Sequence, residues 1–216
     1  LFMKRPIVIL LITAVIVGLG SCKRGEDDPF FTLLSRNARI TGTWDLKEAD
    51  WSIKYRKSTE IDSVYSYRDG KVTLTVNNVE LPPFSQTRTF EMNGQGNYKI
   101  FNVSEYPANY NGSVTPEFTI ETTRNGFWQF GSGNGDVPSK SELVLKQSLY
   151  QQTFAIGANV DVVDVENPAE AFVYSIQRLT NKELVLTYNE VYSDRFGREI
   201  REGTLTYEKV DGQTNI

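Results

Sequence analysis

Residues 39–46 read Arg39-Ile40-Thr41-Gly42-Thr43-Trp44-Asp45-Leu46, and they begin an alternation of apolar and polar residues. Because the side chains of a β-strand point alternately to its two faces, Trp44 and Leu46 would share one face of a strand. The apolar residues that follow have the opposite parity, namely Trp51, Ile53 and Tyr55. Either a β-bulge between Lys47 and Asp50 restores the face, or one strand ends there and a second begins.

The same alternation, interrupted by turn residues, continues through the chain. Val72-Thr73-Leu74-Thr75-Val76 alternates, and Asp69-Gly70 just before it predicts a type I′ hairpin turn after residues 64–67. A helical turn or two is expected over Pro29–Ser35, because Asp28-Pro29 suits an N-cap and a first helical position. We therefore expect an all-β domain, which is an antiparallel meander closed into a barrel or, alternatively, a β-sandwich.

The composition excludes several classes of function. With 216 residues, 39% of them hydrophobic and 23% charged, the chain is long and apolar enough for one all-β domain with a core. It has no histidine, which removes Ser-His-Asp and Cys-His catalysis and histidine metal sites. Its single cysteine rules out an internal disulfide and a cysteine-cluster metal site. The net charge of −4 argues against nucleic-acid binding, and no cofactor is expected.

The first residues have the features of an export signal. Met3-Lys4-Arg5 is basic, and the apolar run over 7–19 has about the length of a secretory signal and is too short for a transmembrane helix. Leu19-Gly20-Ser21-Cys22 resembles the lipobox of bacterial lipoproteins. That resemblance implies cleavage before Cys22 and acyl chains on its sulfur and new amino terminus, which would anchor the protein to a membrane without a spanning segment.

The segment after the cysteine, Lys23-Arg24-Gly25-Glu26-Asp27-Asp28, suits a solvated tether. It also resembles the acidic export signal of surface lipoproteins of the Bacteroidetes group. The expected location is therefore the outer membrane, on the cell surface or, alternatively, on the periplasmic leaflet. The expected organisation is a signal peptide over 1–21, a lipidated tether with a short helical turn over 22–38, and a barrel domain over 39–216.

Gly42-Thr43-Trp44 resembles the Gly-x-Trp opening of lipocalins and of bacterial lipocalin-like lipoproteins, which also place a short helical turn before it. Two later parts of the chain, residues 126–130 followed by 141–145 and residues 174–186, resemble hairpins of the same lipoproteins. The resemblance implies that Gly42 lets the helical turn pass close to the strand and that Trp44 plugs the closed end of the barrel. It also implies an arginine stacked on the tryptophan, for which Arg178 and Arg201 are the candidates.

Three functions from different classes remain. The first is non-enzymatic binding of a small apolar or amphipathic ligand in the barrel. The second is an accessory interaction or glycan-binding lipoprotein with a packed barrel and an unidentified partner. The third is a carboxylate-based hydrolase, with candidates such as Glu48, Asp50 and Glu117. The size of the interior separates the first two, and surface charge explains the acidic residues better than catalysis does.

The expected ligand site is an aromatic cluster of Trp51, Tyr55, Tyr65 and Tyr67. At about 3.3 Å per residue, Trp51 and Tyr55 lie far enough along a strand from Trp44 to approach an open mouth. Tryptophan and tyrosine combine an apolar face with a polar tip, which suits a sugar ring or a lipid tail. The alternative is that these rings fill the upper core.

Two further motifs favour ordinary loops. Gly131-Ser132-Gly133-Asn134-Gly135-Asp136 links two expected strands and opens no helix, which indicates a hairpin tip and not a phosphate-binding loop. The acidic residues Asp161, Asp164, Glu166 and Glu170 lack the spacing of an EF-hand. A solvated loop is therefore preferred to a calcium site.

Overall fold

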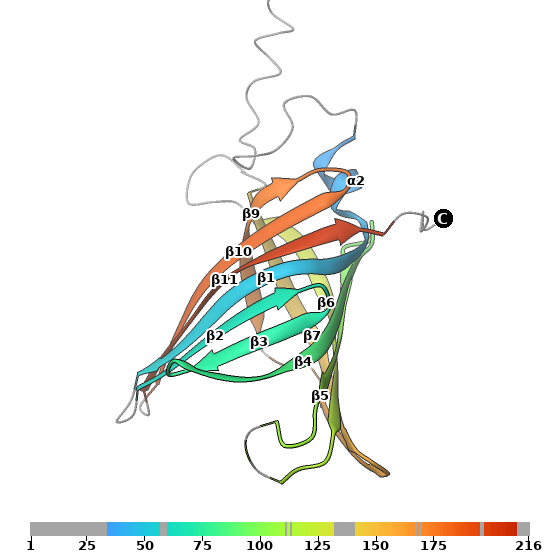
Figure 1. The fold of residues 1–216 in the computed structure, drawn as a ribbon. Helices are drawn as coiled ribbons and strands as arrows, with labels where there is room; N and C mark the ends of the chain where they lie inside the picture. The colour runs from blue at the N-terminus through green and yellow to red at the C-terminus, as the bar shows by residue number, and fades with distance from the viewer. Residues whose placement is uncertain are drawn as a thin grey trace, which may run out of the picture.

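The computed structural model describes residues 34–56, 60–110, 112, 114–131, 141–166, 168, 170–194 and 197–210. These residues form one short helix and eleven strands (Figure 1). Along the chain the elements are α2 (Arg36–Ile40), β1 (Gly42–Arg56), β2 (Glu60–Arg68), β3 (Lys71–Val76), β4 (Val79–Met92), β5 (Asn97–Tyr106), β6 (Phe118–Gly131), β7 (Glu142–Ile156), β8 (Asn159–Glu166), β9 (Ala171–Leu179), β10 (Glu183–Asp194) and β11 (Gly197–Lys209).

Ten of the described strands close into one antiparallel barrel. The order around the sheet is β6-β5-β4-β3-β2-β1-β11-β10-β9-β7, and β6 pairs with β7 to close the ring. β8 pairs with β7 alone and lies outside the ring. The expectation of an all-β barrel is confirmed, and the β-sandwich alternative is excluded.

The barrel widens from one end to the other because a hairpin is inserted into its wall. At the narrow end β1 pairs directly with β4, with Trp44 opposite Phe90, so that the ring there bypasses β2 and β3. Further along, β2 pairs with β1 over residues 48–56 and β3 pairs with β4. The backbone N–H of Gln86 donates to the Gly70 carbonyl at 2.8 Å where the hairpin turn meets β4. Since barrel diameter grows with strand number, two extra strands open the wide end.

At the wide end the barrel separates into two parts that diverge in Figure 1. Within the described residues, β10 from Tyr188 onward pairs only with β11, and β8 pairs only with β7. On the other side, β4 before Ser85 pairs only with β3. We call β10, β11, β1, β2, β3 and the start of β4 the first wall. The second wall consists of β8 and the wide-end parts of β5, β6 and β7.

A β-bulge in β1 resolves the change of parity seen in the sequence. The register between β1 and β11 shifts between Leu46 and Glu48. Because of this shift, Ala49 is buried at 2% exposure and Trp51 lines the interior, on the same side as Leu46. The first of the two sequence alternatives is therefore confirmed. The β2–β3 hairpin is confirmed as well, because Asp69 and Gly70 have φ values of 49° and 80°, as a type I′ turn requires.

The narrow end is a packed core around Trp44. This side chain is fully buried and its Nε1 donates to the Ile40 carbonyl at 2.8 Å. Helix α2 covers this end, with Ser35 as its N-cap, whose hydroxyl accepts from the backbone N–H of Ala38. The helix thus begins after the range expected from the sequence, and residues 29–33 of that range lie outside the described residues.

The cation on the Trp44 ring is a lysine. Lys209 Nζ lies 5.0 Å from the ring centroid and donates to the Arg39 carbonyl, and burial lowers the pKa of this ammonium group. Of the two arginines suggested from the sequence, Arg178 pairs with Glu183 at 2.8 Å, and Arg201 lines an interior cavity. Neither candidate therefore takes this position, because the last strand presents its lysine at the narrow end.

Two segments were predicted to be loops, and the structure describes only one of them. The acidic residues Asp161, Asp164 and Glu166 belong to strand β8, where their side chains are exposed, so the expectation of a loop there is wrong. β8 pairs with β7 along its whole length, and its four valines favour an extended strand. The glycine-rich segment links β6 to β7, but residues 132–140 lie outside the described residues.

Replacing Trp44 with alanine is expected to destabilise the fold by about 3–5 kcal/mol, the usual cost of removing a large aromatic side chain from a core. Denaturant unfolding of Trp44→Ala measures this loss. Phe127→Ala is a matched control because Phe127 is 58% exposed, and its free energy of unfolding is expected to change by about 0.5 kcal/mol or less. Equal stabilities of the two variants would contradict a structural role for Trp44.

Replacing Gly42 with alanine is expected to cost about 1–3 kcal/mol of stability. Gly42 has φ +130°, and a Cβ atom there would lie 2.6 Å from Lys209 Cε, the side chain that covers Trp44. Gly94→Ala is the control, because a Cβ at Gly94 meets nothing within 4 Å. If both variants unfold at the same denaturant concentration as the parent, Gly42 is not needed for the close approach of α2 and β11.

Candidate functional site

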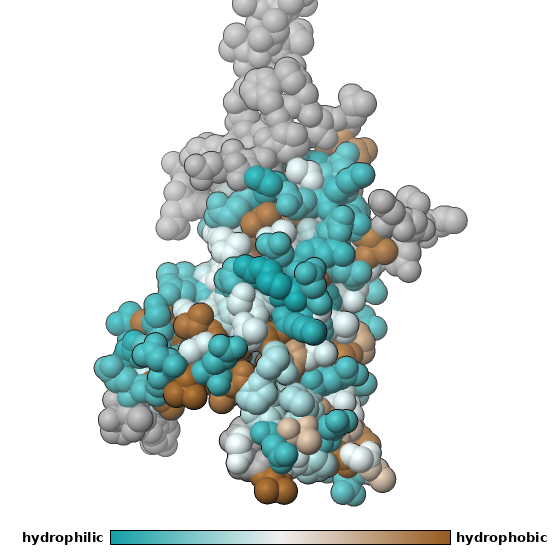
Figure 2. Space-filling view, viewed as in Figure 1, coloured by the Kyte–Doolittle hydropathy of each residue, from teal (hydrophilic) through white to brown (hydrophobic). Residues whose placement is uncertain are grey.

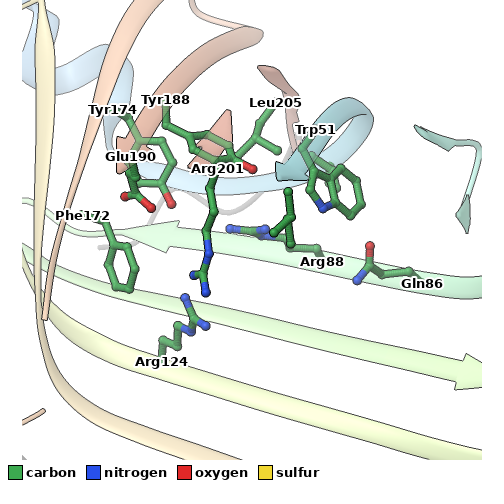
Figure 3. A pocket seen from close by; sticks show the side chains of 12 residues that line it. Trp51, Gln86, Arg88, Arg124, Phe172, Tyr174, Tyr188, Glu190, Arg201 and Leu205 are labelled. Carbon is green, nitrogen blue, oxygen red and sulfur yellow. The ribbon is translucent and has the colours of Figure 1, made fainter. Parts of the chain in front are cut away.

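A cavity of about 220 Å³ lies inside the barrel, between the packed narrow end and the wide end. We call it the central cavity. Its apolar lining comes from Leu46, Trp51, Ile53, Phe172 and Leu205, and its charged lining from Arg88, Arg124, Glu190 and Arg201 (Figure 3). A mixture of apolar surface and a few charged groups is typical of sites that bind small amphipathic molecules.

Trp51 forms one side of the central cavity because two features of its surroundings hold it there. The bulge in β1 turns it inward, and its neighbour on β11 is Gly203, where a Cβ would lie 2.6 Å from Trp51 Cβ. The indole stacks on the ring of Tyr65 from β2, with centroids 4.7 Å apart and planes at 6°. One face of the indole is therefore covered by a partner ring.

Three arginines extend into the central cavity from different strands. Arg88 comes from β4, Arg124 from β6 and Arg201 from β11, and Figure 3 shows their side chains directed toward one another. Arg88 and Arg124 also line a neighbouring pocket of about 140 Å³ together with Asn102 of the intervening strand β5. All three side chains are partly buried, and guanidinium groups keep their charge at any physiological pH.

Two of the carboxylates near these arginines contact or face Arg201, and a third, Glu170, lines the lateral groove with Arg124. Its Nε donates to a carboxylate oxygen of Glu199, and Glu190 lies opposite it on β10. The Arg201 guanidinium also lies 5.1 Å from the ring centroid of Tyr192, whose hydroxyl donates to Glu190. Arg201 is therefore largely neutralised by its own surroundings.

Arg88 and Arg124 are held by aromatic groups and not by acids. The guanidinium of Arg124 lies 5.2 Å from the ring centroid of Phe172 and 5.5 Å from that of Tyr150. The hydroxyl of Tyr174 lies within hydrogen-bond reach of the Arg88 side chain, whereas Arg88 Nε is buried without a partner. Among the described residues, neither arginine forms an ion pair with a carboxylate.

The tyrosine hydroxyls of the interior carry no charge that could balance these arginines. Burial raises the pKa of Tyr98 and of Tyr207 to about 12. Burial also raises the pKa of Tyr188, which lines the central cavity. These hydroxyls therefore stay protonated at neutral pH, where they offer hydrogen bonds but no negative charge.

A groove of about 600 Å³ opens the central cavity to the side. We call it the lateral groove. It lies between the two walls, with Tyr192 of β10 on one side and Val165 of β8 on the other. Arg124, Phe172 and Arg201 line both the groove and the central cavity. The interior is thus accessible between β10 and β8, whose edges there have no strand partner among the described residues. The central cavity and the lateral groove together have the size of a small-molecule site.

The four aromatic residues expected to form the ligand site lie in different environments. Trp51 lines the central cavity, with Tyr65 stacked behind it. Tyr67 belongs to the core, with 4% exposure and its hydroxyl donating to the Leu46 carbonyl. Tyr55 lies further along β1 opposite Ile61 and does not line the cavity. Cys22 lies outside the described residues.

Arg88 and Arg124 were not predicted as site residues from the sequence, although a signal for both was present. Arg88 has the parity of Phe84 and Phe90 on β4, which are buried at 6% and 1% exposure. Arg124 likewise has the parity of the buried Trp128 on β6. An arginine at an inward position of an amphipathic strand marks a charge inside a barrel.

The carboxylates considered for catalysis do not meet in the interior. Asp50 bonds Arg68 at 2.6 Å, and this hydrogen bond lowers the pKa of Asp50, which keeps it ionised. Neither Asp50, Glu48 nor Glu117 lines the central cavity or the lateral groove. In the described part of the chain, no three His, Cys, Asp or Glu side chains are grouped to hold a metal ion, and no helix has the length and apolarity to span a membrane.

Comparison with known proteins found no match: no family model fits the chain, and neither a curated protein nor a solved structure is significantly similar to it. The barrel itself is consistent with a lipocalin-like fold, with a plugged narrow end and an accessible wide end.

Proposed function

We propose that this protein is a lipid-anchored envelope lipoprotein whose barrel binds a small amphipathic ligand without chemical conversion. The observation that carries this proposal is the central cavity, which has an apolar side at Trp51 and a charged side at Arg88 and Arg124. An apolar chain would lie against the indole and the leucines, while a polar headgroup would meet the arginines. The lateral groove would let such a ligand enter without opening the packed narrow end.

The proposed anchor rests on the sequence around Cys22, which resembles a lipobox. Acyl chains at this position would place the barrel near the outer membrane, on the cell surface or on the periplasmic leaflet. Each buried methylene of an acyl chain contributes about 0.8 kcal/mol to membrane binding, so two or three chains hold a protein stably. A membrane would also provide a source of amphipathic molecules close to the barrel.

A second candidate function is an accessory interaction module, favoured by apolar residues exposed at the wide end. Strand β8 exposes Val160, Val162, Val163 and Val165, and its outer edge is unpaired within the described residues. On the first wall, apolar side chains gather at the free end (Figure 2), where Ile61, Val64 and Val79 are exposed. Such surfaces are typical of contacts with another protein.

Tryptophan fluorescence distinguishes these functions. Titration with fatty acids is expected to give a saturable change in wild type, because the ligand would contact Trp51, and no such change in Trp51→Phe. Trp128→Phe is the matched control, because Trp128 is buried with its Nε1 bonded to the Asn93 carbonyl away from the cavity, and it is expected to retain the response. A response to oligosaccharides alone favours the glycan-binding module, and no response to either class contradicts ligand binding in the barrel.

Replacing Cys22 with serine is expected to abolish lipidation, because the thioether needs the cysteine sulfur. Metabolic labelling with a palmitate analogue in a bacterial host that processes lipoproteins, followed by capture of the protein, measures the attached label. Equal labelling of wild type and Cys22→Ser would exclude Cys22 as the anchor, whatever the barrel binds.

A further inference from the structure

We propose that the headgroup of the ligand is an anion, a carboxylate or a phosphate, held between Arg88 and Arg124 inside the barrel. This inference rests on the proposed function and adds the charge and the position of the headgroup. It names as binding residues two arginines that the fold brings together from β4 and β6.

The first argument is the balance of charge in the central cavity. Three arginines line it, and Glu190 is the carboxylate among its lining residues. Glu190 and Glu199 both lie on the side of Arg201, and Glu170, which lines the lateral groove with Arg124, forms no ion pair with it. Two positive charges therefore remain without an acidic partner in the described part of the chain, inside a protein whose net charge is −4. Partly buried cations without partners weaken a fold, and an anionic ligand would remove this cost.

The second argument is the way Arg124 is held. Its guanidinium makes cation–π contacts with the rings of Phe172 and Tyr150, which restrict where the side chain lies. These rings offer no carboxylate to the N–H groups of Arg124, and in the described part of the chain no ion pair engages them. A guanidinium held in this way is prepared for two parallel hydrogen bonds to a carboxylate or a phosphate.

The third argument is the geometry of Arg88 and Arg124 relative to each other. They lie on strands separated only by β5, with Arg88 opposite Asn102 and Arg124 opposite Ile100. Neighbouring strands are about 4.8 Å apart, so two long side chains on strands that are separated by one other strand can reach a common point. Figure 3 shows both side chains extending into the same space, beside the hydroxyl of Tyr174. That hydroxyl supplies a further hydrogen-bond donor for an anion.

The test compares probes that share a chain and differ in headgroup. Isothermal titration calorimetry on the full chain carrying Cys22→Ser would use decanoate, decyl phosphate, decanol and inorganic phosphate. We expect the decyl anions to bind about 10- to 100-fold more tightly than decanol, which is the effect of hydrogen bonds to a charged group. The stronger of decanoate and decyl phosphate then identifies the headgroup.

Variants assign the effect to the two arginines. Arg88→Gln and Arg124→Gln are each expected to weaken binding of the decyl anions about 10-fold or more, with decanol affinity unchanged. Arg68→Gln is the matched control, because Arg68 is exposed on β2 and bonds Asp50. In the absence of ligand, the thermal midpoints of Arg88→Gln and Arg124→Gln are expected to equal or exceed that of the parent, because each removes an unpaired cation.

The outcomes separate the two proposals. If decanol binds as tightly as the anions, or if both Arg→Gln variants bind the anions like the parent, the arginine site is wrong while ligand binding stands. If no probe with a chain binds but inorganic phosphate does so through these arginines, the anion site stands and the proposed amphipathic ligand is wrong. If Arg88→Gln and Arg124→Gln both lower the thermal midpoint and leave affinity unchanged, the arginines are structural and the inference is overturned.

Discussion

The direct pairing of β1 with β4 over Gly42–Asp45 is the constraint on which the shape of the barrel depends. It keeps the narrow end small enough for Trp44 and the side chains around it to fill. Once the β2–β3 hairpin replaces this pairing, the wall gains two strands, and a cavity of about 220 Å³ remains between the interior side chains. One insertion in the sheet thus separates a packed half, which supplies stability, from an open half, which is free to hold a ligand.

The open half is also where the sequence departs from what stability alone favours. A purely structural interior would carry apolar side chains at the positions of Arg88 and Arg124, since unpaired cations gain nothing from burial. Instead, aromatic rings brace Arg124, and neutral hydroxyls surround Arg88. A barrel built in this way exchanges some stability for a charged interior, as sites that bind ligands commonly do.

Local features of the fold could be predicted from the sequence, whereas the arrangement of distant strands could not. The bulge near Lys47 and the Asp69-Gly70 turn follow from parity and turn chemistry, which act over a few residues. The insertion of the hairpin depends on a register between β1 and β4, whose residues lie far apart in the chain. Trp51 was expected near the open mouth, and the structure places it in the lining of the central cavity. The arginines were missed because an arginine in an alternating strand looks like a solvent-facing residue until the inward face is known.

Strand β8 carries three carboxylates, from Asp161, Asp164 and Glu166, between its valines. Two copies of the protein that met edge to edge along β8 would bring these like charges close together, and charged side chains on a free edge oppose such pairing. The same acidic edge would accept a strand rich in lysine or arginine. The barrel can therefore keep a valine-rich edge strand exposed without polymerising through it.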